Sequence, residues 1–363
     1  MKILIISQNT TPLQTPRAFR TAELSEQLAK LGHEVVLYTI HGGKDYSDYE
    51  RQSKVKMRDI NTRFLTISNV GVVRYSFVDR VLNKLLHRLV FYPQIELAFK
   101  VPQIIKSNPN FDLLITIAYP HSIHLGAYRA KRKFPELFPK VWVADCGDPF
   151  CLNPFFDFPK YMRKFEKKWC AACNNITIPT EQGRDGYFKQ YRDKIVVIPQ
   201  GFNFEKTPID EYVGNDVPTF VFTGSVYPNV RDPRSFMDYL LTCGYKYKFK
   251  LYMRTPLEEK YVRESNGQIE YIIGAERSEI IKECSKADFL INVVNPSVVQ
   301  SPSKLIDYGI ANRPILNIST LFTEKDSFLE FLHGDYHNQY FVERLDSYRI
   351  ENVAQQFLDL TKN

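Results

Sequence analysis

The sequence predicts an α/β protein built from two Rossmann-like domains. Short runs of apolar, often β-branched residues recur along the chain and have the length of strands buried on both faces of a parallel sheet. Stretches with apolar residues at helical spacing separate several of these runs, as in βαβ units. A chain of 363 residues is long for one hydrophobic core and fits two domains of ordinary size.

The chain opens with a βαβ unit. Residues 1–6 form an apolar strand, and after a loop we expect a helix from Arg17 to Leu31, with Gly32 as its C-cap. The loop contains no glycine, so the G-x-G-x-x-G pattern of dinucleotide-binding domains is absent. A nicotinamide-dependent dehydrogenase is therefore disfavoured.

The other strands of the first half are apolar runs that end in polar or turn-forming residues. They are expected at residues 112–118, 141–145, 176–179 and 195–199. Between the last two of these strands, we expect a helix from Thr180 to Tyr191.

The second half repeats the alternation of strands and helices. Its strands are expected at residues 219–223, 248–253, 269–272, 289–294 and 314–318. The intervening residues 201–217 are rich in charge and proline, as in a linker. Residues 350–360 form an amphipathic segment near the end of the chain.

The composition is that of a soluble globular protein, with 44% hydrophobic and 25% charged residues. No apolar run approaches the roughly 20 residues of a membrane span, and the start of the chain lacks the features of a signal peptide. The six cysteines are therefore expected as reduced thiols of a cytoplasmic protein. Cys170 and Cys173 form a C-x-x-C pair in a helical stretch. Either both are structural cysteines, or they bind a metal or act in redox chemistry.

The net charge of +7 is unevenly distributed. Residues 1–200 hold 30 Lys and Arg against 18 Asp and Glu, whereas the remainder hold 18 against 23. A basic first half indicates an anionic partner. The chain has no helix-turn-helix, zinc-finger or RNP signature, so nucleic acid is not expected. An anionic membrane surface or a lipid-linked diphosphate fits better.

Residues 78–106 are the candidate for the membrane-facing element. They are expected to form one or two helices, with leucines and valines on one side and basic side chains on the other. Such a segment either packs its apolar side against the core or lies on an anionic membrane.

The stretch after the strand at 289–294 predicts an anion-binding site. Ser303 is a suitable N-cap for a helix that follows this strand, and Lys304 adds a mobile cation at the positive end of the helix dipole. Asp307, one turn further on, could accept two hydroxyls of a ribose. The other interpretation is a capped surface helix with a solvated Lys and Asp.

A second loop in this half has matching chemistry. The strand at 219–223 runs into Gly224 and Ser225, whose backbone amides could approach a phosphate. Arg231 follows in the same loop and would pair with that phosphate.

These two segments resemble the donor site of glycosyltransferase family 4. They read S-K-L-I-D-Y-x-I-A-x-x-P-I and T-G-S-x-Y-x-x-x-R-D-P. Family members are retaining enzymes with the GT-B fold, two Rossmann-like domains that face each other across a cleft. The resemblance implies an acceptor-binding domain at 1–200, a linker at 201–217 and a donor-binding domain at 218–345. It also implies that a helix within 346–363 packs back on the first domain.

The resemblance assigns roles to the donor-site residues. Asp307 would hold the ribose of the donor. The donor diphosphate would contact Gly224, Ser225, Arg231, Ser303 and Lys304.

Family likeness in the first domain assigns further residues. The pattern P-R-x-x-x-x-A-E-L resembles the family's opening, which implies that Arg17 and Arg20 contact the acceptor. His121 matches a histidine close to the reacting sugar, with His124 as the alternative, and Asp148 matches a cleft-facing aspartate. The other interpretations are an exposed arginine pair, a structural histidine and a turn-forming Asp-Pro.

One position departs from the family pattern. The family carries E-x7-E, and Asp307 occupies its second position while Val299 stands at the first. A carboxylate that touches the transferred sugar is therefore missing from its usual place.

The predicted function is transfer of a sugar from a UDP- or GDP-sugar to a saccharide or lipid-linked saccharide, with retention, in cell-surface polysaccharide synthesis. We expect a cytoplasmic enzyme, peripheral at the inner face of the membrane, with no cofactor and no metal, because Arg231 and Lys304 can neutralise the leaving diphosphate. The alternatives are a non-catalytic nucleotide-binding partner in a polysaccharide assembly complex and a GT-B sugar-nucleotide epimerase.

Overall fold

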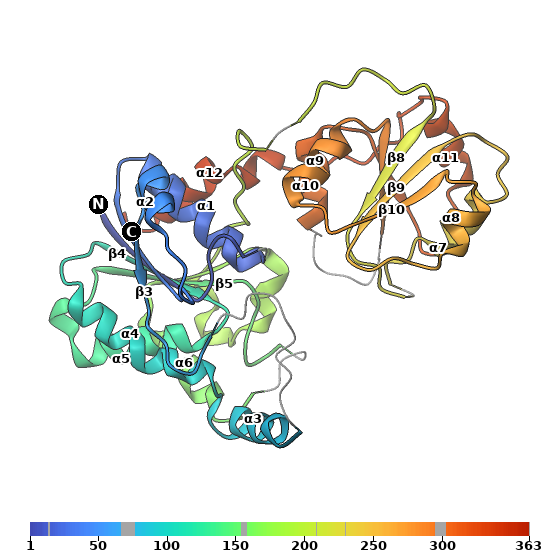
Figure 1. Cartoon of the computed structure of the whole chain (residues 1–363). Helices are drawn as coiled ribbons and strands as arrows, with labels where there is room; N and C mark the ends of the chain where they lie inside the picture. The colour runs from blue at the N-terminus through green and yellow to red at the C-terminus, as the bar shows by residue number, and fades with distance from the viewer. Residues whose placement is uncertain are drawn as a thin grey trace. The chain divides into compact units, whose positions relative to one another are not determined.

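The computed structural model describes residues 1–13, 15–66, 77–153, 158–207, 209–228, 230–294 and 303–362, without the side chains of 77–83 and 303. These residues form two compact units, each with its own parallel sheet (Figure 1). Unit 1 comprises Met1–Phe202 and Ser347–Asn363, and unit 2 comprises Asn203–Asp346. The predicted α/β class with two Rossmann-like domains is confirmed. The cleft expected between the domains stays a prediction.

Unit 1 is built on a seven-stranded parallel sheet of order β3-β2-β1-β4-β5-β6-β7. The strands are β1 (Lys2–Ser7), β2 (Glu34–Thr39), β3 (Lys56–Asp59), β4 (Leu113–Ala118), β5 (Val141–Cys146), β6 (Asn175–Ile178) and β7 (Ile195–Val197). The strand order reverses between β1 and β4, and ligands of such sheets bind at the carboxyl ends of the strands near this point.

Helices cover both faces of this sheet (Figure 1). The helices of unit 1 are α1 (Pro16–Lys30), α2 (Ser47–Ser53), α3 (Phe77–Val90), α4 (Leu97–Ser107), α5 (Ser122–Lys133), α6 (Met162–Ala172) and α12 (Ile350–Asp359). One core joins the sheet to α4, α5 and α6, and the other joins it to α1 and α12. Of the one or two helices expected at 78–106, the structure has two, α3 and α4.

The helix expected from Thr180 to Tyr191 was wrong. The segment forms two short 3-10 helices, Glu181–Gly186 and Lys189–Lys194. Glycines at 183 and 186 weaken an α-helix, and Gly186 lies so close to Pro149 that a Cβ would stand 2.3 Å from the proline Cγ. Sequence patterns also missed β3 and α2, which are short and polar.

The C-terminal helix α12 belongs to unit 1. Its side chains Ile350, Val353 and Phe357 complete the core that contains α1. The approach is close at Gly201, where a Cβ would stand 2.5 Å from Cδ1 of Ile350. The amide of Ile350 donates to the carbonyl of Phe202 at 2.9 Å, which ties the two passages of the chain together at the edge of unit 1.

Unit 2 has a five-stranded parallel sheet of order β10-β9-β8-β11-β12. Its strands are β8 (Thr219–Thr223), β9 (Lys248–Met253), β10 (Ile269–Ile273), β11 (Phe289–Val293) and β12 (Ile315–Ile318). Its helices are α7 (Arg234–Leu240), α8 (Lys260–Glu264), α9 (Arg277–Ser285), α10 (Ser303–Ala311) and α11 (Lys325–Leu332). The main core is aromatic, with Phe220 stacked on Phe249 and Phe289 at ring-centroid distances of 4.9 and 4.8 Å.

The segment predicted as a linker divides at the boundary between the units. Gly201 and Phe202 lie in unit 1, and the following residues lie in unit 2. Within unit 2, the Tyr212 hydroxyl donates to the Asp288 carboxylate, and the Arg313 guanidinium stacks on the Tyr212 ring at 3.4 Å. The second part of this segment is therefore held on the surface of unit 2.

Candidate active site

Lys304 and Arg231 of unit 2 interact electrostatically, and each has a buried nitrogen without a hydrogen-bond partner among the described residues. Lys304, the second residue of α10, is 7% exposed, and its Nζ has no partner among the described residues. This Nζ lies 4.5 Å from the centroid of the Phe222 ring. The buried Nε of Arg231 also has no partner in the described part of the chain. Burial and the charge of Arg231 hold the pKa of Lys304 well below its ordinary value. An anionic ligand would offset the repulsion from Arg231 and favour the charged form of Lys304, so this pair of side chains suits an anion.

The loop after β8 positions Arg231. The backbones of Tyr227 and Arg231 exchange two hydrogen bonds, of 3.0 and 2.9 Å. The loop leaves the strand at Gly224 with φ of +112°, a conformation that strains any residue with a Cβ. The Gly224 amide donates to the carbonyl of Tyr252 at 2.9 Å, so Gly224 contributes its conformation and not the free amide that the sequence predicted. The contact expected from Ser225 stays a prediction.

Tyr308 fixes this loop relative to α10. Its hydroxyl accepts a hydrogen bond from the Thr223 amide at 2.9 Å and donates to the carbonyl of Ile291 at 3.0 Å. The side chain is fully buried. One hydroxyl therefore joins the end of β8 and the middle of β11 to the helix that carries Lys304.

Asp307 is paired with an arginine that the sequence did not indicate. The Nε of Arg277 donates to Oδ1 of Asp307 at 3.0 Å, and Nη2 donates to the same oxygen. Burial raises the pKa of Asp307, and Arg277 opposes this rise. The ribose role of Asp307 stays a prediction. The side chain of Ser303 and the whole of Val299 lie outside the described residues.

In unit 1, His121 follows the carboxyl end of β4 and starts α5. It is 2% exposed, its ring stacks on Phe150 at 4.6 Å, and its Nδ1 has no partner among the described residues. Burial lowers the pKa of His121 to about 3, so its imidazole is neutral at physiological pH. A neutral ring can exchange hydrogen bonds with a sugar hydroxyl but cannot supply a proton as a strong acid.

His124, the alternative histidine, is part of an internal hydrogen-bond chain. Trp142 Nε1 donates to the Thr116 hydroxyl, which lies 2.8 Å from His124 Nδ1. His124 Nε2 lies 3.4 Å from the sulfur of Cys146. One ligand atom each from His121, His124 and Cys146 lies within 4.8 Å of the others, a grouping that could hold a metal ion. Both nitrogens of His124 already have partners. We therefore assign this chain of hydrogen bonds a structural role, in which it holds α5 against β4 and β5.

The two predicted acceptor arginines have different surroundings. Arg20 is 2% exposed, and its guanidinium donates to both oxygens of Asp145 at 3.2 and 2.9 Å and to the carbonyl of Pro199. Arg20 therefore has a structural role in place of the acceptor contact that the sequence predicted. Arg17 is more exposed, and its Nη1 lies 3.6 Å from Oδ2 of Asp145. Its guanidinium rests on Gly147, where a Cβ would stand 2.6 Å from Cζ.

Asp148 lies on the loop after β5 and is exposed. This loop is anchored from α6, where Oε2 of Glu166 accepts a hydrogen bond from the Cys151 amide at 3.2 Å. Phe150 lies in the same loop, just before Cys151, and its ring stacks on His121. The structure thus gathers Arg17, His121 and Asp148 around the carboxyl ends of β4 and β5, and Arg231, Lys304 and Asp307 around the corresponding edge in unit 2.

The family model described as Glycosyltransferase Family 4 matches residues 19–206, which is just over half of the chain. The chain belongs to glycosyltransferase family 4. It is therefore a transferase enzyme, as predicted. No curated protein matches this glycosyltransferase in sequence.

Solved structures similar to this glycosyltransferase cover nearly its whole length. A glycosyltransferase from Rickettsia africae has a TM-score of 0.62 at 12% identity, with 99% of this chain and 97% of that chain covered. The lipopolysaccharide outer core galactosyltransferase WaaB has a TM-score of 0.58 at 12% identity, with 99% of each chain covered. The Anabaena protein HepE, solved in complex with UDP, has a TM-score of 0.56 at 10% identity, with 100% and 98% covered. These likenesses show the fold, which is GT-B.

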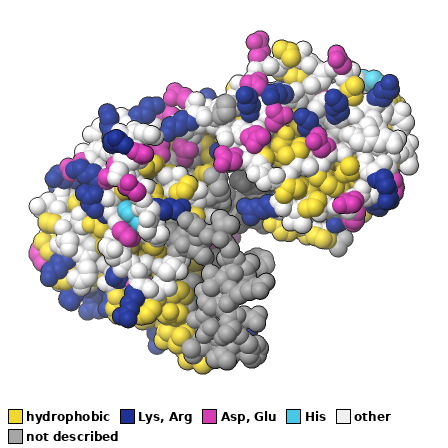
Figure 2. All heavy atoms as spheres, in the orientation of Figure 1, with side chains coloured by type: hydrophobic (Ala, Val, Ile, Leu, Met, Phe, Trp, Pro, Cys, Tyr) yellow, Lys and Arg dark blue, Asp and Glu magenta, His cyan; other side chains and the backbone are white. Residues whose placement is uncertain are grey.

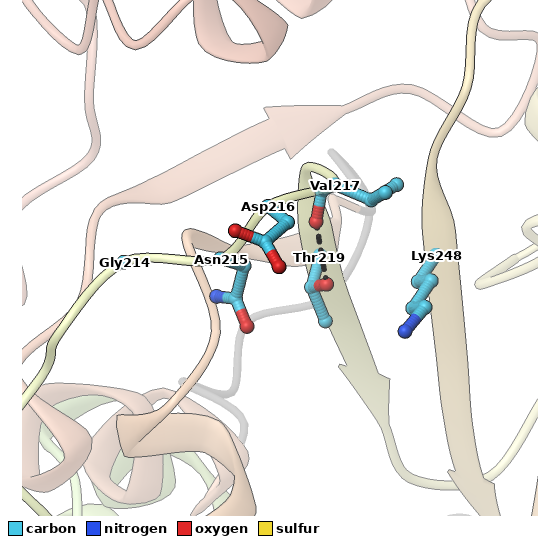
Figure 3. A pocket seen from close by; sticks show the side chains of 6 residues that line it. All are labelled: Gly214, Asn215, Asp216, Val217, Thr219 and Lys248. Carbon is cyan, nitrogen blue, oxygen red and sulfur yellow. Dashed lines mark hydrogen bonds between the residues drawn. The ribbon is translucent and has the colours of Figure 1, made fainter.

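The glycosyltransferase has a pocket of about 340 Å³ in unit 2 (Figure 3). None of the candidate site residues lines it. It is lined by Gly214, Asn215, Asp216, Val217, Thr219 and Lys248. Thr219 and Lys248 are the first residues of β8 and β9, so the pocket is at the amino ends of these strands. Ligands of open α/β sheets bind at the carboxyl ends, and we do not assign this pocket to the donor.

Sequence reasoning did not single out several residues that shape the candidate sites of this family 4 enzyme. Some of them could have been recognised from the sequence, and others could not. Asp145 stands in an apolar strand, which is a sign of a buried ion pair. Arg277 and Glu166 lie among other charged residues and could not be distinguished from surface side chains. Tyr308 occupies a core-facing position of a helix, where a tyrosine hydroxyl needs a partner.

Proposed function

We propose that this glycosyltransferase transfers a sugar from a nucleoside-diphosphate donor, UDP- or GDP-linked, to a saccharide or lipid-linked saccharide in cell-surface polysaccharide synthesis, with retention. The observation that carries the donor assignment is the buried Lys304, whose Nζ has no described partner, beside Arg231, whose buried Nε has none either. A diphosphate would give both side chains a counterion. UDP bound to the similar protein HepE supports a nucleotide donor.

The chemistry follows from the charges and protonation states of the named groups. Lys304 and Arg231 stabilise the negative charge that develops on the leaving diphosphate, so the proposal needs no metal or cofactor. Neutral His121 positions a hydroxyl of the transferred sugar. Asp148, on its exposed loop, accepts a hydrogen bond from the acceptor, and Arg17 binds an anionic group of the acceptor.

An anionic membrane surface is part of the same proposal. Leu85, Leu89 and Val90 of α3 are 51%, 58% and 44% exposed, so this side of the helix does not pack into the core. The Tyr161 hydroxyl donates to the carbonyl of Leu89 at 2.8 Å, which connects α3 to the basic start of α6. Figure 2 shows apolar side chains gathered at this end of unit 1. Among the described residues, no helix is long and apolar enough to cross a bilayer. We further propose that the enzyme lies at the inner face of the membrane, in contact through α3.

The donor assignment is tested by calorimetric titration of UDP and GDP into the wild type and Lys304→Ala. We expect the variant to bind the nucleotide about ten- to a hundred-fold more weakly, because a hydrogen bond to a charged group contributes about 1.5–3 kcal/mol. Lys246→Ala removes an exposed lysine of unit 2 and should leave the affinity unchanged. Equal affinities for wild type and Lys304→Ala would exclude the assigned diphosphate site.

A further inference from the structure

The ion pair between Arg277 and Asp307 has an unusual, one-sided geometry. An arginine usually meets a carboxylate with two parallel bonds, one to each oxygen. Here Nε and Nη2 of Arg277 both donate to Oδ1 of Asp307. Among the described residues, none donates to Oδ2. One carboxylate oxygen is therefore fixed, and the other is left to accept hydrogen bonds from a ligand.

The pair stands at the surface of unit 2, where a ligand can reach it. The Arg277 and Asp307 side chains are 25% and 19% exposed. Arg277 is the first residue of α9, which follows β10, and Asp307 lies in α10, which follows β11. Helices α9 and α10 pack against each other. Both side chains thus come from helices that begin at the carboxyl edge of the sheet, where Lys304 in α10 and Arg231 in the loop after β8 also lie.

The pairing also separates the charges of the site. Lys304 precedes Asp307 by three residues, a spacing at which Lys and Asp on a helix can pair. Lys304 Nζ has no partner among the described residues, and the carboxylate is held by Arg277 instead. Arg277 therefore orients Asp307 and leaves Lys304 available for phosphate.

We propose that Arg277 is a positioning residue that aims Oδ2 of Asp307 at a ribose hydroxyl of the donor and so makes the enzyme selective for ribonucleotides. This inference rests on the proposed nucleoside-diphosphate donor. Without the two bonds to Oδ1, the carboxylate would rotate freely and would lose its directed contact with the sugar of the nucleotide.

The test compares UDP and GDP with their 2′-deoxy and 3′-deoxy forms in calorimetric titrations. We expect the wild type to favour a ribonucleotide over its weaker-binding deoxy form by about ten-fold or more, the effect of one hydrogen bond to a charged group. Arg277→Met retains the length of the side chain without its donors, and we expect its selectivity to fall to about two-fold. Asp307→Asn should lose the same selectivity.

Two controls separate this inference from the proposed function. Lys304→Ala should weaken ribo- and deoxynucleotides by the same factor and keep their ratio. If Arg277→Met does not fold, Arg277→Lys keeps a cation with a different shape and should show reduced selectivity. Two results would overturn the inference and leave the diphosphate site in place. One is a wild type that binds ribo- and deoxynucleotides equally well. The other is an Arg277 variant that keeps the wild-type preference for ribonucleotides. A wild type that binds neither nucleotide would overturn both.

Discussion

Glu166 shows how a single buried side chain can couple the site of unit 1 to pH. It is 1% exposed, its Oε2 accepts the Cys151 amide, and its Oε1 has no partner among the described residues. Burial raises the pKa of Glu166 from 4.5 to about 7. The folded state therefore holds a proton that the unfolded chain releases at lower pH. The stabilisation by this proton is complete below about pH 4.5 and is lost as the pH rises through about 7.

We predict that Glu166→Gln flattens the pH dependence of stability. The wild type should lose about 3 kcal/mol of unfolding free energy from this group between pH 5 and pH 8, since one pKa unit corresponds to about 1.4 kcal/mol. The glutamine variant, which does not titrate, should lose less over the same range. Urea unfolding at both pH values measures the difference. Glu136→Gln, at an exposed position of unit 1, is the control and should behave as the wild type.

Lys304 is also expected to change its protonation when a nucleotide binds. Burial and Arg231 lower the pKa of Lys304, whereas a bound diphosphate would favour the protonated form of this lysine. Nucleotide binding should therefore take up a proton and weaken as the pH rises through the lowered pKa of Lys304. Calorimetry in two buffers with different ionisation enthalpies measures the uptake. Lys304→Ala should abolish it, and equal proton uptake by wild type and variant would contradict the prediction.

At the scale of elements, Tyr308 is the connection that holds the donor loop to α10. We predict that Tyr308→Phe lowers the unfolding free energy by about 1–3 kcal/mol, because the amide of Thr223 and the carbonyl of Ile291 lose a buried partner. Nucleotide affinity should also fall, since the strand that leads into the Arg231 loop is no longer fixed. Urea unfolding and UDP titration measure the two effects. Tyr245→Phe changes a partly exposed tyrosine and should leave both unchanged.

Most strands and several helices could be predicted from the sequence, because the apolar runs are short and bounded by polar or turn-forming residues. Among the elements that were missed or wrong are β3, α2 and the 3-10 helices of 181–194, which carry little hydrophobic pattern. At the candidate donor site, Lys304 and Arg231 could be proposed from the sequence because they follow buried strands, and their roles stay predictions. The pairing of Arg277 with Asp307 and the burial of Arg20 depend on contacts between distant segments, which local patterns do not contain.

For the whole molecule, the charge distribution and the exposed apolar residues of α3 lead to a prediction about membranes. We predict that the enzyme sediments with vesicles that contain anionic lipid and not with neutral vesicles. Binding should weaken with salt, since each basic residue near the surface contributes about 1 kcal/mol through screened charge. Replacing Leu85 and Leu89 together with Ser should reduce binding at all salt concentrations. Leu321→Ser, at an 80% exposed position of unit 2, is the control.

The return of α12 to unit 1 has a consequence for the order of events during synthesis. The core that contains α1 includes Ile350, Val353 and Phe357, so the part of this face that α12 covers stays open while the ribosome translates residues 203–346. The segment of unit 2 is complete before the residues that close unit 1 emerge. The unit that starts first therefore finishes last, and the apolar residues that pack against α12 stay exposed on the nascent chain in the interval.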